Sequence, residues 1–76
     1  MGKFKLETKY TKLRGLRRYF EITLDVVAMS VECSSGYINR LERGYVKEVK
    51  DKSKREAILS YIEKLQARAN KETSLP

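Results

Sequence analysis

The sequence has no histidine, no tryptophan, one proline and a single cysteine in 76 residues. Because Cys33 stands alone, the chain cannot form an intramolecular disulfide or a metal site built from several cysteines. Without histidine it lacks the commonest general base and metal ligand, and it carries no glycine-rich phosphate loop. Glu21 and Asp25 are four residues apart, but they flank an expected helix start, where capping explains them. We therefore expect no enzyme, no cofactor, no metal and no small-molecule substrate.

Long apolar runs are also missing. No segment approaches the run of about 18 apolar residues that a membrane span requires, and the sequence shows no signal-peptide pattern. We expect a cytoplasmic protein. A single domain of this length buries only about 60% of the surface that its unfolded chain exposes. Its core must therefore be small, and a deep catalytic cleft is not expected.

Positive charge is in excess and unevenly distributed. Seventeen Lys and Arg residues stand against ten Asp and Glu residues. Residues 1–20 hold seven basic groups and one acidic group, whereas residues 21–33 hold only three acidic groups. Residues 34–55 again hold seven basic groups against three acidic ones. Two basic blocks favour one basic face and a polyanionic partner, although charge of this kind could also simply keep a small helical protein in solution.

Apolar residues recur with helical spacing, and no segment alternates as a strand would. Four helices are predicted, near residues 9–20, 23–31, 34–43 and 53–68. The chain is divided into a flexible basic N-terminus, one folded domain and a flexible tail, at residues 1–8, 9–69 and 70–76. The fold class is therefore all-α.

Polar residues and one glycine mark the expected helix ends. Thr23 and Ser34 are suitable N-caps for the second and third helices, and Gly44 is suited to end the third helix in a left-handed conformation. Ser53 and Glu56 have the spacing of a capping box at the start of the fourth helix. The basic first turn of that helix opposes the helix dipole, which suggests that its cations bind an external anion.

The third predicted helix has a narrow apolar stripe. Only Ile38 and Leu41 point inward, with Tyr37 at the edge. The outward polar face consists of Ser35, Gly36, Asn39, Arg40 and Arg43. Two short helices joined by a tight turn, with a polar face on the second, are typical of a helix-turn-helix that reads DNA.

The run TLDVVAMSVECSSGYINRLERG, residues 23–44, resembles the phage-repressor-like helix-turn-helix family, the Cro/CI or XRE-type regulators. Val27 and Ala28 match the apolar-plus-alanine pair of the first motif helix. The sequence LERG, residues 41–44, is the most specific part of the match. With the flanking helices, the resemblance covers about residues 9–65.

The resemblance implies a compact lambda-repressor-like bundle of four or five helices. It also implies a sequence-specific regulator of transcription, of phage, plasmid or mobile-element type, that binds double-stranded DNA as a homodimer and acts as a repressor. The positions that match base-reading residues are Ser35, Gly36, Asn39 and Arg40. Those that match residues near phosphates or a groove edge are Thr23, Tyr37, Arg43, Lys47 and Lys50. Arg17 and Glu42 match a family salt bridge that joins the first helix to the recognition helix.

Two positions depart from the family pattern. Glu32 occupies the turn position that usually holds glycine, where a left-handed residue with a side chain costs on the order of 1 kcal/mol, so the turn could instead be lengthened. Gly36 lies inside the recognition helix, at a cost of roughly 1 kcal/mol relative to alanine. It also offers no side chain with which to read a base.

Each functional interpretation has a structural alternative. Asn39 could pair with adenine and Arg40 with guanine, or both could be ordinary solvated helix surface. Ser35 could contact a base or only assist the cap. The basic residues after Gly44 could contact phosphates or belong to a solvated linker.

The main alternative function is a protein-interaction adaptor with a helix-turn-helix fold. The fourth helix could then dock on a partner through Ile58, Tyr61, Ile62 and Leu65. A basic amphipathic helix on a membrane surface is a weaker alternative, because the same apolar residues are needed for the core. Binding that falls steeply with salt and prefers one duplex sequence would separate DNA binding from the adaptor function.

Overall fold

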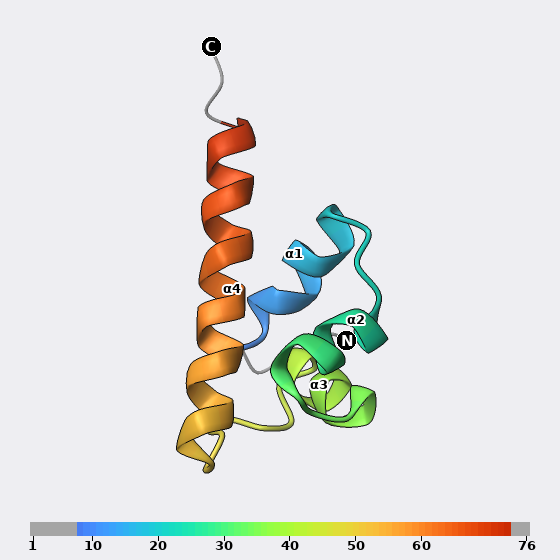
Figure 1. Cartoon of the computed structure of the whole chain (residues 1–76), viewed down its shortest axis with the longest axis vertical. Helices are drawn as coiled ribbons and strands as arrows, with labels where there is room; N and C mark the ends of the chain where they lie inside the picture. Colours follow the sequence, from blue (N-terminus) through green and yellow to red (C-terminus); the bar gives the residue numbers. More distant parts are fainter. Residues whose placement is uncertain (1–7, 74–76) are drawn as a thin grey trace, which may run out of the picture.

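The computed structural model describes residues 8–73, and these residues form four helices and no strand. The helices are α1 (Lys12–Tyr19), α2 (Leu24–Val31), α3 (Ser35–Glu42) and α4 (Lys52–Thr73). In Figure 1, the long helix α4 stands on the left, and the three short helices lie together to its right. The predicted all-α class is confirmed, with four helices.

The starts of α2 and α3 carry the predicted N-caps. The Thr23 hydroxyl accepts a hydrogen bond from Val26 N at 3.3 Å, and the Ser34 hydroxyl accepts one from Tyr37 N at 3.1 Å. Both residues have extended backbone angles, as N-caps do. These two predicted caps are confirmed.

The predicted capping box at the start of α4 is wrong. The helix begins at Lys52, and the carboxylate of Asp51 accepts a hydrogen bond from Lys54 N at 3.1 Å. Aspartate is as good an N-cap as serine. It comes two residues earlier, so Ser53 lies inside the first turn rather than before it.

Each of the three short helices ends in a Schellman motif, in which a left-handed residue turns the chain and two backbone N–H groups bond to carbonyls of the last turn. The left-handed residues are Glu21 at φ 58°, Glu32 at φ 58° and Gly44 at φ 87°. The residue after each donates to the carbonyl five positions earlier, as Cys33 N does to Ala28 O at 2.9 Å. The predicted role of Gly44 is confirmed, and the turn at Glu32 is not lengthened.

The core lies where all four helices meet. The buried apolar side chains are Tyr10, Leu13, Val27, Ala28, Val31, Ile38, Leu41, Val49, Ile58, Ile62 and Leu65. Each large one contributes roughly 1.5–3 kcal/mol relative to an exposed position. Nearly all of them are the apolar residues that the helical spacing selected.

The predicted first helix is shorter at its start. Residues 8–11 form a turn instead, because the Thr8 hydroxyl accepts a hydrogen bond from Tyr10 N at 3.0 Å and the Thr11 hydroxyl donates to Thr8 O at 3.0 Å. Threonine side chains that bond the backbone locally compete with helix formation. The turn directs Tyr10 into the core, where its side chain is fully buried.

The fourth helix is longer than predicted, so the expected tail is wrong for residues 70–73. Arg68 stacks over the ring of Phe20, with 4.4 Å from Cζ to the ring centroid. The Tyr19 hydroxyl donates to Glu72 at 3.3 Å. These contacts with the end of α1 extend α4 beyond its apolar residues. The remainder of the expected flexible ends, residues 1–7 and 74–76, lies outside the described residues.

Candidate nucleic-acid interface

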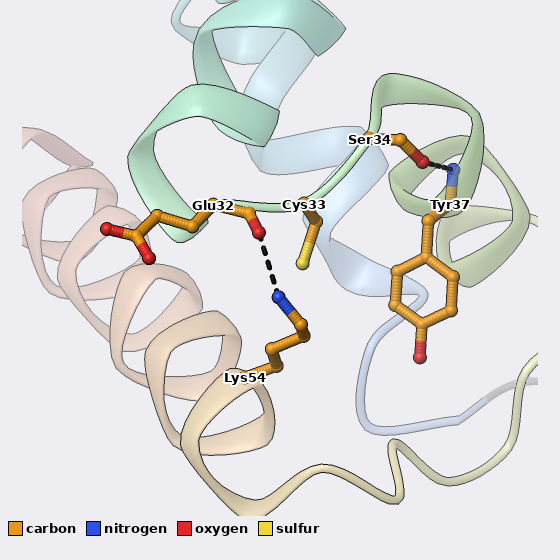
Figure 2. Close-up of a pocket in the computed structure, with 5 residues that line it drawn as sticks. All are labelled: Glu32, Cys33, Ser34, Tyr37 and Lys54. Atoms are coloured by element: carbon orange, nitrogen blue, oxygen red, sulfur yellow. Dashed lines mark hydrogen bonds between the residues drawn. The ribbon is translucent and has the colours of Figure 1, made fainter.

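The turn between α2 and α3 sets the position of α3. Its left-handed residue, Glu32, is exposed, and its carbonyl accepts a hydrogen bond from Lys54 Nζ at 2.9 Å (Figure 2). The bond joins the first turn of α4 to the end of α2. It also gives Lys54 an intramolecular partner. Arg55 likewise donates to Val49 O at 2.9 Å, so the basic first turn of α4 does not require an external anion.

Helix α3 lies at the edge of the described bundle. It lies closest to α2 and α1, and within residues 8–73 its backbone does not approach the backbone of α4. Ile38 and Leu41 are fully buried and form the inner side of α3. The outer side therefore stays accessible along the length of the helix.

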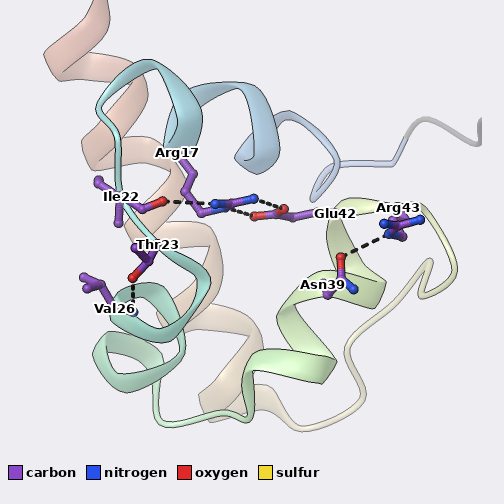
Figure 3. Close-up of polar contacts among 7 residues, drawn as sticks. All are labelled: Arg17, Ile22, Thr23, Val26, Asn39, Glu42 and Arg43. Carbon is purple, nitrogen blue, oxygen red and sulfur yellow. Dashed lines mark hydrogen bonds and ion pairs between the residues drawn. The ribbon is translucent and has the colours of Figure 1, made fainter.

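A buried ion pair holds the end of α3 on α1. Arg17 Nε lies 2.7 Å from Glu42 Oε2, and Arg17 Nη2 lies 3.0 Å from Glu42 Oε1. The third guanidinium nitrogen, Nη1, donates to Ile22 O at 3.0 Å (Figure 3). The side chain of Glu42 is 1% exposed and that of Arg17 is 15% exposed. The hydrogen bond with Glu42 raises the pKa of Arg17 above its ordinary value, so the guanidinium of Arg17 stays protonated.

The outer side of α3 carries Gly36, Asn39, Arg40 and Arg43. Residues three, four and seven apart on a helix share one face, and Gly36, Arg40 and Arg43 are exposed whereas Asn39 is half-buried. Ser35 is also half-buried, next to the cap. Of the four residues expected to read bases, three are therefore on this face, and Ser35 is at its edge.

Asn39 and Arg43 are joined to each other. Arg43 Nε donates to Asn39 Oδ1 at 3.1 Å (Figure 3). An amide oxygen has a second lone pair and the amide nitrogen has two donors, so Asn39 retains groups that could meet an adenine edge. The bond also orients the guanidinium of Arg43, which was expected near a phosphate.

Gly36 has no role in packing within residues 8–73. A Cβ added at this position would meet no heavy atom within 4 Å, and its φ is not positive. Glycine at such a position costs about 1 kcal/mol of helix stability relative to alanine. Neither the conformation nor the packing of the described chain accounts for that cost.

Two of the expected groove-edge residues lie near the starts of α2 and α3. Thr23 is exposed, and its hydroxyl oxygen already caps α2. Tyr37 is half-buried and lines a small pocket with Glu32, Cys33, Ser34 and Lys54 (Figure 2). Burial raises the pKa of the Tyr37 phenol, so the phenol is a neutral hydrogen-bond donor at pH 7.

The polar groups around this pocket serve the turn itself. Ser34 caps α3, Lys54 bonds the Glu32 carbonyl, and the thiol of Cys33 donates to Val31 O at 3.5 Å. No group of three or more potential metal ligands occurs among residues 8–73. Within the same residues, no helix is long and apolar enough to cross a membrane.

The segment between α3 and α4 contains two more of the residues that were expected near phosphates or a groove edge. Lys47 and Lys50 are both exposed. Between them, Val49 is buried, and its backbone N–H donates to the Tyr10 hydroxyl at 3.3 Å. This bond and the bond from Arg55 to Val49 O anchor the segment, so the two lysines extend from a backbone that is tied to the core.

Sequence reasoning did not single out Tyr45, an exposed aromatic residue at the end of α3. It directly follows Gly44, its side chain is 70% exposed, and its backbone N–H donates to Arg40 O at 3.1 Å. The residue at this position of a Schellman motif commonly packs back on its own helix. An aromatic residue immediately after a predicted C-terminal glycine was the signal available in the sequence.

Comparisons of the chain with known protein families, with curated proteins and with solved structures gave no match.

Proposed function

We propose that this protein is a sequence-specific regulator that binds double-stranded DNA, with α2 and α3 as a helix-turn-helix and α3 as the recognition helix. The observation that supports this proposal most strongly is the position of α3. It is anchored on its inner side by Ile38, Leu41 and the buried ion pair of Glu42 with Arg17. On its outer side it presents a polar and basic face. A rigidly held helix with such a face fits the major groove.

Two further features support the proposal. Lys47 and Lys50 are exposed just beyond α3, where phosphate contacts would fix the register of the helix on the duplex. Gly36 has no role in packing among the residues that the structure describes, and its missing side chain would let the start of α3 approach a base or the DNA backbone closely. The resemblance of residues 23–44 to the phage-repressor-like family agrees with this assignment.

The proposal includes a homodimer that acts as a repressor. A recognition helix of eight residues covers few base pairs, so a two-fold partner would supply the rest of the site. The two recognition helices would lie about 34 Å apart on one face of the duplex. Sedimentation of the complex together with footprinting would show two related half-sites, whereas a monomer on a non-repeated site would contradict the dimer.

The decisive experiment is selection of bound sequences from random duplex DNA. We expect enrichment of one short motif, with affinity for it that falls steeply as salt rises. Recovery of unrelated sequences that all bind with the same affinity would contradict sequence-specific recognition.

A protein-interaction adaptor is the second candidate function. Val26 and Met29 lie one turn apart on α2 and are 49% and 79% exposed. A partner helix could cover these apolar side chains. Such an adaptor would show no preferred duplex sequence, so the same selection experiment separates the two functions.

A further inference from the structure

Three cations outside α1 and the candidate interface form ion pairs with acidic side chains. Among residues 8–73, Lys9 and Arg55 pair with Glu48, at 3.5 and 3.8 Å, and Arg68 pairs with Glu72 at 4.0 Å. Helix α1 combines several cations with no acid. It contains Lys12, Arg14, Arg17 and Arg18 and no acidic residue. Of these four, only Arg17 forms an ion pair within the described residues.

Arg14 and Arg18 form a like-charged pair on the outside of α1. They are four residues apart, so their side chains are neighbours on one face of the helix, and both are exposed. Like charges at this spacing destabilise a helix. No acidic side chain among residues 8–73 forms an ion pair with either arginine, so nothing in the described chain offsets the repulsion.

Gly15 follows Arg14 in the sequence and lies beside the arginine pair on the helix surface. It is exposed, its φ is not positive, and an added Cβ would meet no heavy atom within 4 Å. Glycine inside a helix is destabilising relative to alanine. As at Gly36, neither the backbone conformation nor the packing of the described residues explains why glycine occupies this position. The outer face of α1 therefore combines two features that weaken the helix.

The ion pair connects this face to α3. Arg17 is adjacent to Arg18 in the sequence, and it turns inward to the buried carboxylate of Glu42 at the end of α3. Contacts made by the outer side of α1 would thus act on a body that is fixed relative to the recognition helix.

We propose that the face of α1 formed by Arg14, Gly15 and Arg18 is a second DNA-contacting surface, which binds backbone phosphates outside the recognition helix. Guanidinium groups bind phosphate oxygens in a bidentate manner. The missing side chain at Gly15 allows a phosphate to approach the helix backbone beside the two arginines. This inference rests on the proposed function, because the ligand of the α1 surface is the same double-stranded DNA. The bound phosphates supply the anionic partners that Arg14 and Arg18 lack within the described residues.

The test replaces one charge at a time. Arg14→Gln and Arg18→Gln are titrated, with the wild type, against the selected duplex and a scrambled one at several salt concentrations. We expect each substitution to weaken both duplexes equally, by roughly five- to tenfold at 0.1 M salt. The slope of log K against log salt should fall by about 0.9 for each phosphate that the variant no longer neutralises. Lys64→Gln is the matched control, because Lys64 is exposed on α4 and its replacement changes the net charge by the same amount.

Gly15→Gln separates folding from binding. Because glutamine favours the helix and the site has open space, this variant should melt at a higher temperature than the wild type. It should nevertheless bind both duplexes several-fold more weakly. Gly15→Gln that is more stable and binds DNA as the wild type does would overturn the role of Gly15.

The outcomes distinguish this proposal from the proposed function. If the wild type prefers one duplex but the arginine variants bind like Lys64→Gln, the α1 surface is wrong and the recognition helix stands. If the arginine variants lose salt-dependent binding to every duplex while the wild type shows no preferred sequence, the α1 surface stands and sequence recognition fails. Binding of the wild type to vesicles containing phosphatidylserine that both variants lose, without any change on DNA, would overturn the α1 proposal in favour of a membrane.

Discussion

The carboxylate of Glu42 accepts two hydrogen bonds from the guanidinium of Arg17, at 2.7 and 3.0 Å, across a gap of 25 residues in the sequence. The Glu42 side chain is 1% exposed. Removing one member of a buried pair costs about 3–5 kcal/mol, because it leaves the other charge buried without a partner. We expect Glu42→Ala to lower the melting temperature by more than about 10 °C, given shifts of 4–8 °C per kcal/mol in domains of this size. Circular dichroism melts would measure it.

Glu48→Ala is the matched control for that variant. Glu48 also has two cationic neighbours, Lys9 and Arg55, but its side chain is 56% exposed. Solvent-exposed pairs are worth about 1 kcal/mol or less. Equal melting temperatures for Glu42→Ala and Glu48→Ala would contradict a stabilising role for the buried pair.

The left-handed conformation of Glu32 predicts that glycine at this position stabilises the protein. Its φ of 58° is left-handed, where a side chain costs on the order of 1 kcal/mol and glycine avoids that cost. We expect Glu32→Gly to match or exceed the wild type in stability and Glu32→Ala to be less stable than Glu32→Gly by about 1 kcal/mol. Urea denaturation of the three proteins would test this order. Glu32→Ala at least as stable as Glu32→Gly would show that the turn is not held in this conformation.

The burial of Tyr37 predicts that the protein loses stability at alkaline pH. Burial raises the pKa of its phenol above the ordinary value of 10.0. A group whose pKa is raised by folding contributes fully below its unfolded pKa, and this contribution is lost as pH rises through the folded pKa. From about pH 10 upward, the free energy of unfolding should therefore fall more steeply in the wild type than in Tyr37→Phe. Parallel curves in urea unfolding, from about pH 8 to pH 11, would contradict the assigned burial effect.

Asn39 and Lys47 should have different effects on DNA binding. Loss of a base contact in Asn39→Ala should cost about 1–3 kcal/mol on the preferred site and relax discrimination at one base pair. Loss of a phosphate contact in Lys47→Ala should weaken all duplexes alike and reduce the salt slope by about one. Both variants would be titrated against the selected site, its single-base variants and a scrambled duplex.

The hydrogen bond from Arg43 to Asn39 adds a necessary control. Asn39→Ala also releases Arg43 Nε, which could disturb a phosphate contact. Arg43→Gln measures that effect alone, and it should weaken all duplexes without relaxing any base preference. If Asn39→Ala weakens specific and scrambled DNA equally, Asn39 does not read a base and the recognition face is misplaced. If neither Asn39→Ala nor Lys47→Ala changes binding, the adaptor function moves ahead.

Local interactions made much of the fold predictable. The apolar spacing of the four helices, the N-caps Thr23 and Ser34 and the left-handed Gly44 all depend on residues within a few positions of one another. Such signals can be read from a single sequence, because hydrogen bonds of caps and turns join near neighbours. The polar outer side of α3 follows from the same spacing.

The sequence by itself therefore determined the helical class, most helix ends and the face of α3 that is exposed. The family resemblance implied the pair of Arg17 with Glu42, but tertiary structure alone decided the long-range partners of Lys54, Tyr10 and Arg68. Lys54 bonds the Glu32 carbonyl, Tyr10 holds Val49, and Arg68 stacks on Phe20 to extend α4. Each of these contacts joins residues between 22 and 48 positions apart, so no local pattern encodes it. It exists only because the packed helices bring the two groups together.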